Sequence, residues 1–197
     1  MLETIVHWDT VVTLFLNRLH SPLLNTLFYW ISDRWVWTPL YFFVMAVVIK
    51  KWKKKTLVIL IMLVFALTVS DQGCNVLKNN IKRLRPSHNI ELVSKIHLVE
   101  TPDGELYRGG KYGFPSAHAS NAVVFALFVF FFAGNQKIWV LFAAFLWAAL
   151  LGYSRIYLGV HYWLDVECGY LVGTVSFALI FGGRYYLKKK IIRNSVF

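Results

Sequence analysis

A histidine and an aspartate toward the C-terminus carry the most informative spacing in the chain. His161 and Asp165 are four residues apart, so on one helical turn the carboxylate can accept a hydrogen bond from the imidazole. That bond fixes the tautomer and leaves the other ring nitrogen free as a nucleophile. Arg155 precedes them and adds a forked cation suited to phosphate oxygens. A buried structural ion pair is the alternative, but it does not account for the histidine.

A second cluster, YRGGKYGFPSAH, ends at His118. Pro115 and Ser116 precede an apolar run, which is typical of a helix start. Free backbone N–H groups and a partial positive charge at a helix N-terminus suit a phosphate. Ser116 can add a hydroxyl donor, and His118 projects from the first turn. Taken alone, a histidine at this position is more often an interface residue. We assign Gly109 and Gly110 to the turn rather than to a ligand.

A third cluster of cations, KNNIKRLRP, lies at the end of an apolar run. Lys78 and Arg85 are seven residues apart, so they share one stripe if the helix continues. We expect Lys82 and Arg83 to extend toward lipid headgroups. Asp71 lies deep enough in the apolar run to need a partner, for which we expect a hydrogen bond to another helix.

In chain order the clusters read K-x6-RP, PS-x-H and SR-x5-H-x3-D. This pattern resembles the three-part signature of the type 2 phosphatidic acid phosphatase superfamily, and the resemblance covers residues 36–183. The small bacterial membrane members are the most similar, through the YRGG-x-YGFPS approach to the second motif. The resemblance implies an antiparallel bundle of membrane helices with the site at one bilayer face.

The resemblance also implies roles for individual residues. The phosphate-binding residues would be Lys78, Arg85, Ser116, Arg155 and, through its backbone N–H, Ala117. His161 would be the nucleophile, Asp165 would orient it, and His118 would protonate the leaving group. The chain departs from the family where Ala117 replaces the usual glycine of PSGH, and where Trp163 replaces a proline or small residue. Because the backbone N–H is retained at Ala117, we expect activity to survive.

The composition of the chain predicts the fold that positions these clusters. The chain of 197 residues is 57% hydrophobic and 16% charged, whereas soluble domains carry about 25% charged residues. We predict an all-α integral-membrane antiparallel bundle of about five to six spans. Residues 1–34 would form amphipathic interfacial helices and residues 35–197 a transmembrane core, within a single domain. The uncharged runs that predict the spans are Val36–Ile49, Thr56–Ser70, Ala119–Asn135, Ile138–Tyr153 and Leu171–Gly183.

The N-terminal segment, residues 4–31, is amphipathic, and Pro22 begins its second apolar stretch. We interpret it as two short helices at one membrane interface. A tilted additional span is the alternative.

The net charge of +11 raises the question of nucleic acid, but the basic residues punctuate apolar runs and form no continuous polar stripe. We therefore expect no nucleic-acid partner. Placing Lys50–Lys55, Lys137 and the segment Arg184–Arg193 in the cytoplasm puts eleven basic residues inside and eight on the site side. This favours a bacterial inner membrane protein whose active site faces the periplasm.

These features predict a lipid phosphatase that forms a phosphohistidine on His161 and needs no cofactor. The sequence has no C-x-x-C, no H-E-x-x-H and no dense carboxylate group, so we expect no metal. Phosphatidylglycerol phosphate, undecaprenyl diphosphate, phosphatidic acid and lipid A phosphate all remain open as substrates, although an outward site favours the second and the last. The alternatives are a lipid phosphotransferase, a vanadate-dependent peroxidase, and a non-catalytic headgroup binder or transporter. The sequence gives no oligomeric state.

Overall fold

The computed structural model describes residues 2–182. The predicted end of the last span and the basic segment Arg184–Arg193 lie outside these residues. The described part is helical, and its first two helices are α1 (Leu2–Asn17) and α2 (Pro22–Ser32). The bundle helices are α3 (Thr38–Trp52), α4 (Thr56–Ile81), α5 (Ala117–Phe128), α6 (Ile138–Tyr157) and α7 (Trp163–Phe177).

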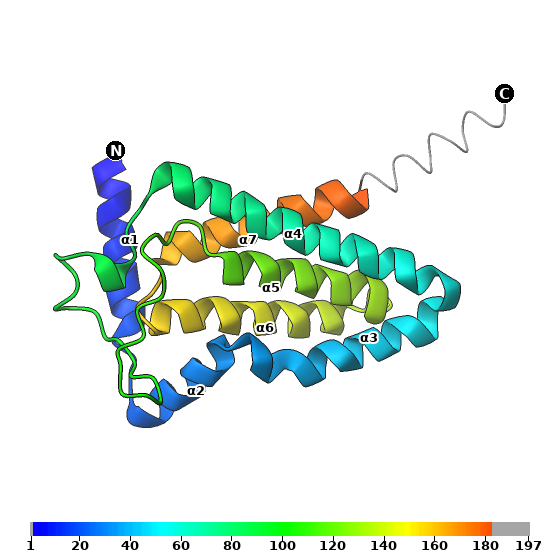
Figure 1. Cartoon of the computed structure of the whole chain (residues 1–197), viewed down its shortest axis with the longest axis horizontal. Helices are drawn as coiled ribbons and strands as arrows, with labels where there is room; N and C mark the ends of the chain where they lie inside the picture. The colour runs from blue at the N-terminus through cyan, green and yellow to red at the C-terminus, as the bar shows by residue number, and fades with distance from the viewer. Residues whose placement is uncertain (1, 183–197) are drawn as a thin grey trace.

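The five bundle helices lie side by side and form the long body of the molecule (Figure 1). By length and composition, the segments Arg34–Ile81, Ile138–Tyr157 and Trp163–Gly182 can each cross a membrane. The first is 48 residues long and contains both α3 and α4, joined by the lysine-rich turn Lys53–Lys55. The shorter apolar segment Ala117–Ala133 holds α5 and its π-helical extension. These helices confirm the predicted membrane bundle.

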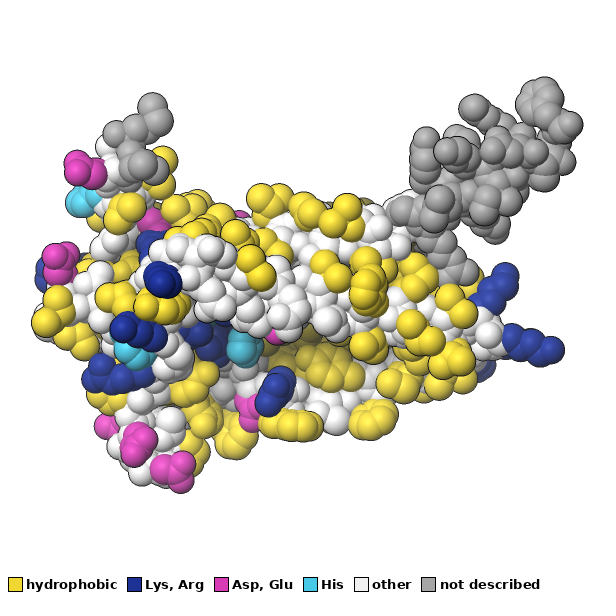
Figure 2. All heavy atoms as spheres, turned by 45° about the horizontal axis from the view of Figure 1, so that its top comes forward, with side chains coloured by type: hydrophobic (Ala, Val, Ile, Leu, Met, Phe, Trp, Pro, Cys, Tyr) yellow, Lys and Arg dark blue, Asp and Glu magenta, His cyan; other side chains and the backbone are white. Residues whose placement is uncertain are grey.

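Apolar side chains cover the flanks of the bundle, and charged side chains gather mainly toward its two ends (Figure 2). Large side chains such as Phe42, Phe142 and Leu171 are about two-thirds exposed, at 66%, 70% and 64%. Soluble monomers rarely expose so much contiguous apolar surface. The flanks are therefore the surface that faces lipid.

Helix α5 is central, and small residues let α7 approach it closely. A Cβ atom at Gly169 or Gly173 would overlap the backbone carbonyl oxygens of Ser116 or Ser120. Two glycines four residues apart form the small-xxx-small pattern of close membrane-helix packing. The Ser116 amide also donates to the Asp165 carbonyl oxygen at 2.7 Å. This packing fixes the N-terminal ends of α5 and α7 against each other.

Helix α1 lies across one end of the bundle, and α2 runs from that end toward α3 (Figure 1). The Asn17 amide of α1 donates to the carbonyl oxygens of Ile156 and Tyr157, at 3.2 and 2.8 Å, at the end of α6. Its side-chain oxygen accepts from the His97 backbone amide at 2.7 Å. Pro22 begins α2 as the sequence predicts. The interfacial position of both helices remains a prediction.

The segment between α4 and α5 folds over the same end of the bundle. Its two arms pair where they meet the helices: the Arg85 amide donates to the Lys111 carbonyl oxygen at 3.1 Å, and the Gly113 amide to that of Arg83 at 2.9 Å. Lys82 takes a left-handed conformation, with φ of 53°, and ends α4. The helix therefore does not continue to Arg85, and the stripe expected for Lys78 and Arg85 on one helix is wrong.

Candidate active site

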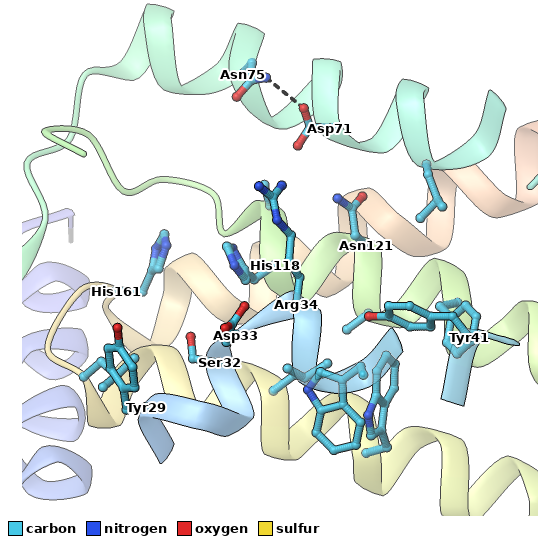
Figure 3. A pocket seen from close by; sticks show the side chains of 18 of the residues that line it. Tyr29, Ser32, Asp33, Arg34, Tyr41, Asp71, Asn75, His118, Asn121 and His161 are labelled. Carbon is cyan, nitrogen blue, oxygen red and sulfur yellow. Dashed lines mark hydrogen bonds between the residues drawn. The ribbon is translucent and has the colours of Figure 1, made fainter. Parts of the chain in front are cut away.

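A cavity of about 930 Å³ lies at this end of the bundle (Figure 3). Side chains from α2 through α6, from the segment after α4 and from the α6–α7 loop line it. Of the residues that the sequence singles out, those lining the cavity are Lys78, Arg85, Ala117, His118 and His161. Ser116, Arg155 and Asp165 are buried in the surrounding protein.

His161 belongs to the loop between α6 and α7, and only 1% of its surface is exposed. Its Nδ1 atom lies 3.3 Å from Asp165 Oδ2, which also accepts from the Tyr162 amide at 3.0 Å. The second bond caps the start of α7, so the helix itself holds the carboxylate in place. When Nδ1 donates to this carboxylate, Nε2 carries the free lone pair.

The surroundings keep His161 uncharged. Burial and then the nearby charges of Arg85, Arg155 and Lys78 lower the pKa of His161 well below its usual value, and a backbone hydrogen bond with Gly113 partly opposes them. A neutral imidazole is the form in which a histidine acts as a nucleophile. Both the position of His161 beside Asp165 and its lowered pKa therefore favour a role as a nucleophile.

No ion pair among the described residues includes Lys78, Arg85 or Arg155, the cations near His161. Arg85 Nε donates to the Tyr112 carbonyl oxygen at 3.2 Å, while a buried terminal nitrogen of Arg85 has no partner in the described structure. Burial and the charge of Arg155 lower the pKa of Arg85 to about 10, so it stays charged at neutral pH. Unpaired buried cations are costly unless a ligand supplies the opposite charge. This cluster is suited to an anion.

Arg155 reaches the cluster from the last turn of α6. Its guanidinium donates to Ser32 Oγ and, at 3.2 Å, to the Tyr107 hydroxyl, while its buried Nε has no partner among the described residues. Gly109, with φ of +64°, lies against Arg85, where a Cβ atom would come within 2.6 Å of a guanidinium nitrogen. The glycine therefore makes room for the arginine.

The start of α5 forms another wall. Ser116 caps the helix by accepting a 3.4 Å hydrogen bond from the Ala119 amide, and the serine is fully buried. Ala117 lines the cavity, and the exposed His118 side chain points into it (Figure 3). The hydroxyl of Ser116 thus has a structural partner, and its predicted contact with phosphate remains a prediction.

Arg83 differs most from its expected place. It does not extend toward lipid headgroups: its guanidinium donates to Asp165 Oδ1 at 2.9 Å and to Asp9 Oδ2 at 2.5 Å. It also stacks on the Tyr162 ring at 3.8 Å. Asp9 Oδ1 accepts from the Leu164 amide at 2.8 Å. Without Arg83 the carboxylates of Asp9 and Asp165 would be buried charges with no compensating cation, which is strongly destabilising.

The sequence contained a signal for this link. Asp9 is a carboxylate within an amphipathic helix, and a buried carboxylate needs a partner. The expectation for Asp71 is wrong as well: within the described part of the chain, its carboxylate accepts from Asn75 of the same helix at 3.1 Å and from no other helix.

Comparison with known proteins shows the family to which the chain belongs. Residues 55–189 match the model of the PAP2 superfamily. The chain is 33% identical over 175 residues to the lipid A 4'-phosphatase of Bacteroides thetaiotaomicron, covering 88% of this chain and 75% of the relative. It is 34% identical over 177 residues to the enzyme of that name from Porphyromonas gingivalis, covering 88% of this chain and 72% of the relative.

Two solved structures share the fold at 25% identity. The first is LpxE of Aquifex aeolicus, with a TM-score of 0.66 and coverage of 88% of this chain and 94% of that one. The second is a transmembrane PAP2-type phosphatidylglycerolphosphate phosphatase from Bacillus subtilis, with a TM-score of 0.68 and coverage of 93% and 87%. The chain is therefore a multi-pass membrane lipid phosphatase of the PAP2 superfamily.

Proposed function

We propose that the protein hydrolyses a lipid phosphate or diphosphate through a phosphohistidine on His161. The observation that carries this proposal is the buried imidazole held by Asp165, beside a cavity that Lys78 and Arg85 line and behind whose wall Arg155 is buried. Preorganised cations of this kind stabilise the charge that develops on a phosphoryl group in transfer. The candidate cations are Lys78, Arg85 and Arg155.

The first step transfers the phosphoryl group. Nε2 of His161 attacks phosphorus, the new N–P bond forms, and the bond from phosphorus to the lipid oxygen breaks. Protonated His118 gives its proton to the departing oxygen. As the imidazole gains positive charge, Asp165 stabilises it through the Nδ1 hydrogen bond.

The second step restores the enzyme. Neutral His118 takes a proton from water, the resulting hydroxide attacks phosphorus, and the N–P bond breaks to release inorganic phosphate. If a second lipid replaced water, the same chemistry would make the protein a phosphotransferase. Measuring free phosphate against phosphorylated acceptor lipid separates the two outcomes.

We propose further that no metal takes part, since the three cations can supply the charge that a metal would otherwise contribute. Phosphate release is expected to be unchanged in EDTA. Loss of release in EDTA that Mg²⁺ restores would contradict this part of the proposal.

The substrate and the orientation are also proposals. We place the chain in a bacterial inner membrane with the site facing the periplasm, where undecaprenyl diphosphate and lipid A phosphate are the favoured candidates. The two lipid A 4'-phosphatases to which the chain is similar support the second. Lys95 lies in the segment over the site, so a cysteine placed there should react with an impermeant maleimide from the periplasmic side. Labelling only after the membrane is permeabilised would show that the site faces the cytoplasm.

The decisive experiment traps the intermediate. Purified protein is mixed with radiolabelled lipid phosphate, and acid-labile, base-stable label is measured on the protein. We expect label on the wild type and none on His161→Ala. We expect more label on His118→Ala with p-nitrophenyl phosphate, because this leaving group needs no proton while hydrolysis still does. Stable release of phosphate by His161→Ala would overturn the proposal.

A further inference from the structure

Helix α1 contacts the bundle through a stripe of polar side chains. Asp9, Thr13 and Asn17 are spaced four residues apart, so they lie on one face of α1. Each of them is at most 2% exposed, whereas Trp8 and Phe15 are 63% and 64% exposed. The buried face of this helix is thus polar, where a helix of a soluble protein would bury apolar side chains. Buried polar groups need hydrogen-bond partners, and the stripe finds them at the ends of α6 and α7.

One end of the stripe contacts the C-terminal end of α6. Helix α6 ends at Tyr157, and the last carbonyl groups of a helix have no α-helical amide partner within it. The Asn17 side chain donates to two of these groups, the carbonyl oxygens of Ile156 and Tyr157. Helix α1 is therefore anchored directly before the loop that carries His161.

The other end of the stripe contacts the N-terminal end of α7. This helix begins at Trp163, and the first amides of a helix likewise have no partner within it. The Trp163 amide donates to Thr13 Oγ1 at 3.0 Å, and the Leu164 amide donates to Asp9 Oδ1 at 2.8 Å. Two side chains of α1, which are 150 and 155 residues away in the sequence, therefore cap α7.

The Trp163 amide lies midway along the chain between the candidate nucleophile and the carboxylate that orients it. His161 precedes Trp163 by two residues and Asp165 follows it by two, and the side chains of this pair meet at 3.3 Å. A shift of the Trp163 backbone therefore changes how the imidazole and the carboxylate meet. The Thr13 hydroxyl also donates to the Asp9 carbonyl oxygen at 2.7 Å. That bond directs the hydroxyl hydrogen away from Trp163 and leaves a lone pair to accept from its amide.

We propose that Thr13 is a positioning residue for His161: by capping the start of α7 from α1, its hydroxyl holds the nucleophile and Asp165 in the geometry of attack. This inference rests on the proposed phosphohistidine mechanism. It adds an element, α1, that precedes the residues matched by the PAP2 model. Thr13 is not among the described residues that line the cavity, so it acts through α7 and not by touching the substrate.

Thr13→Val tests the proposal, because valine has nearly the shape of threonine and lacks its hydroxyl. We expect kcat to fall about fivefold on p-nitrophenyl phosphate and on phosphatidic acid alike, with KM changed less than about twofold. Rapid-quench labelling should show the same decrease in the rate at which the phosphohistidine forms. Thr13→Ser restores the hydroxyl and should recover most of kcat. If Thr13→Val does not fold, Thr13→Ala against Thr13→Ser gives the same comparison, since both lose the methyl group and only serine keeps the hydroxyl.

Thr10→Val is the matched control on the same helix. Thr10 also donates to the carbonyl oxygen four residues earlier, that of Val6 at 2.9 Å, but among the described residues no amide of α7 donates to it. The two substitutions therefore differ in the bond to Trp163, and Thr10→Val should keep kcat within about twofold of the wild type.

Three results would each overturn the inference. They are a folded Thr13→Val protein with normal kcat and a normal labelling rate, equal losses in Thr10→Val and Thr13→Val, and a loss that Thr13→Ser does not recover. None of them bears on the proposed function, which is tested separately by the labelling of the wild type and of His161→Ala.

Discussion

The two sides of His161 differ in how completely their polar groups are paired. Behind the histidine, Asp165, Arg83 and Asp9 satisfy one another and reach from the α6–α7 loop to α1. We call these three residues the support network. In front of it, Arg34 and Asn121 line the cavity, and the buried Oδ1 atom of Asn121 has no hydrogen-bond partner among the described residues.

This difference separates positioning from recognition. A paired and buried network holds a side chain in one geometry, which is what a nucleophile requires. Polar groups left unpaired around a cavity are available to a ligand. Changes to the support network should therefore lower turnover of every substrate, whereas the effect of changes to Arg34 or Asn121 should depend on the substrate.

Arg83→Leu should have the largest effect of the variants that leave the cavity lining intact. It leaves the carboxylates of Asp9 and Asp165 buried without their shared cation, which is costly. We expect kcat to fall about 10- to 100-fold with little change in KM, the scale typical of partners that orient a reacting group. Stopped assays of phosphate release on lipid and on p-nitrophenyl phosphate would measure it.

Two further variants distinguish positioning from folding. Arg83→Lys keeps the positive charge but loses the planar guanidinium that donates to both carboxylates. Compared with Arg83→Leu, it should therefore recover part of kcat and most of the thermal stability. Lys82→Asn removes the neighbouring exposed charge at a left-handed position that asparagine tolerates, and it should behave like the wild type. A stable Arg83→Leu protein with normal kcat on both substrates would show that the network is structural only.

Gly113→Ala should have the next largest effect. A Cβ atom there would lie 2.7 Å from Asp165 Oδ2 and 3.1 Å from Arg85 Cγ, so both groups must move. We expect kcat to fall about 10-fold on all substrates, because small displacements of reacting groups are costly. Gly110→Ala is the control, since nothing lies within 4 Å of its Cβ position. Equal activity of the two variants would contradict the close fit around Asp165.

The sequence predicted the bundle and the motifs because both depend on local patterns. Apolar runs predict spans, and the polar clusters fall at their ends. The close approach of α5 to α7 was harder to predict, because Gly169 and Gly173 become informative only once their neighbours Ser116 and Ser120 are known.

The support network was missed for a physical reason. Asp9 and Arg83 are 74 residues apart. In addition, the sequence pattern assigned phosphate binding to the nearby Arg85 and left Arg83 without a predicted role in the site. The position of Arg85 depended on the turn at Lys82, where a lysine takes a conformation that its residue type does not favour. Neither a long-range ion pair nor a left-handed residue at a helix end produces a periodic pattern in the sequence.

The smallest expected effect concerns pH. Because burial and the nearby cations lower the pKa of His161, its nucleophilic form persists below pH ~6.5, where a free imidazole becomes protonated. Activity should fall only as the pH drops through this lowered pKa, because protonation removes the lone pair that attacks phosphorus.

Arg85→Gln tests the cause of this shift. Among the charges that lower the pKa of His161, that of Arg85 has the largest effect, so its removal should raise that pKa and move the acidic limb of kcat/KM upward by about half a pH unit. Lys111→Gln removes an exposed charge from the same segment and should leave the limb in place. Both profiles are measured on p-nitrophenyl phosphate between about pH 4 and 9, the range that a histidine pair governs. A limb that stays in place or moves downward in Arg85→Gln would show that burial alone keeps the nucleophile neutral, and that the cations act on the substrate rather than on His161.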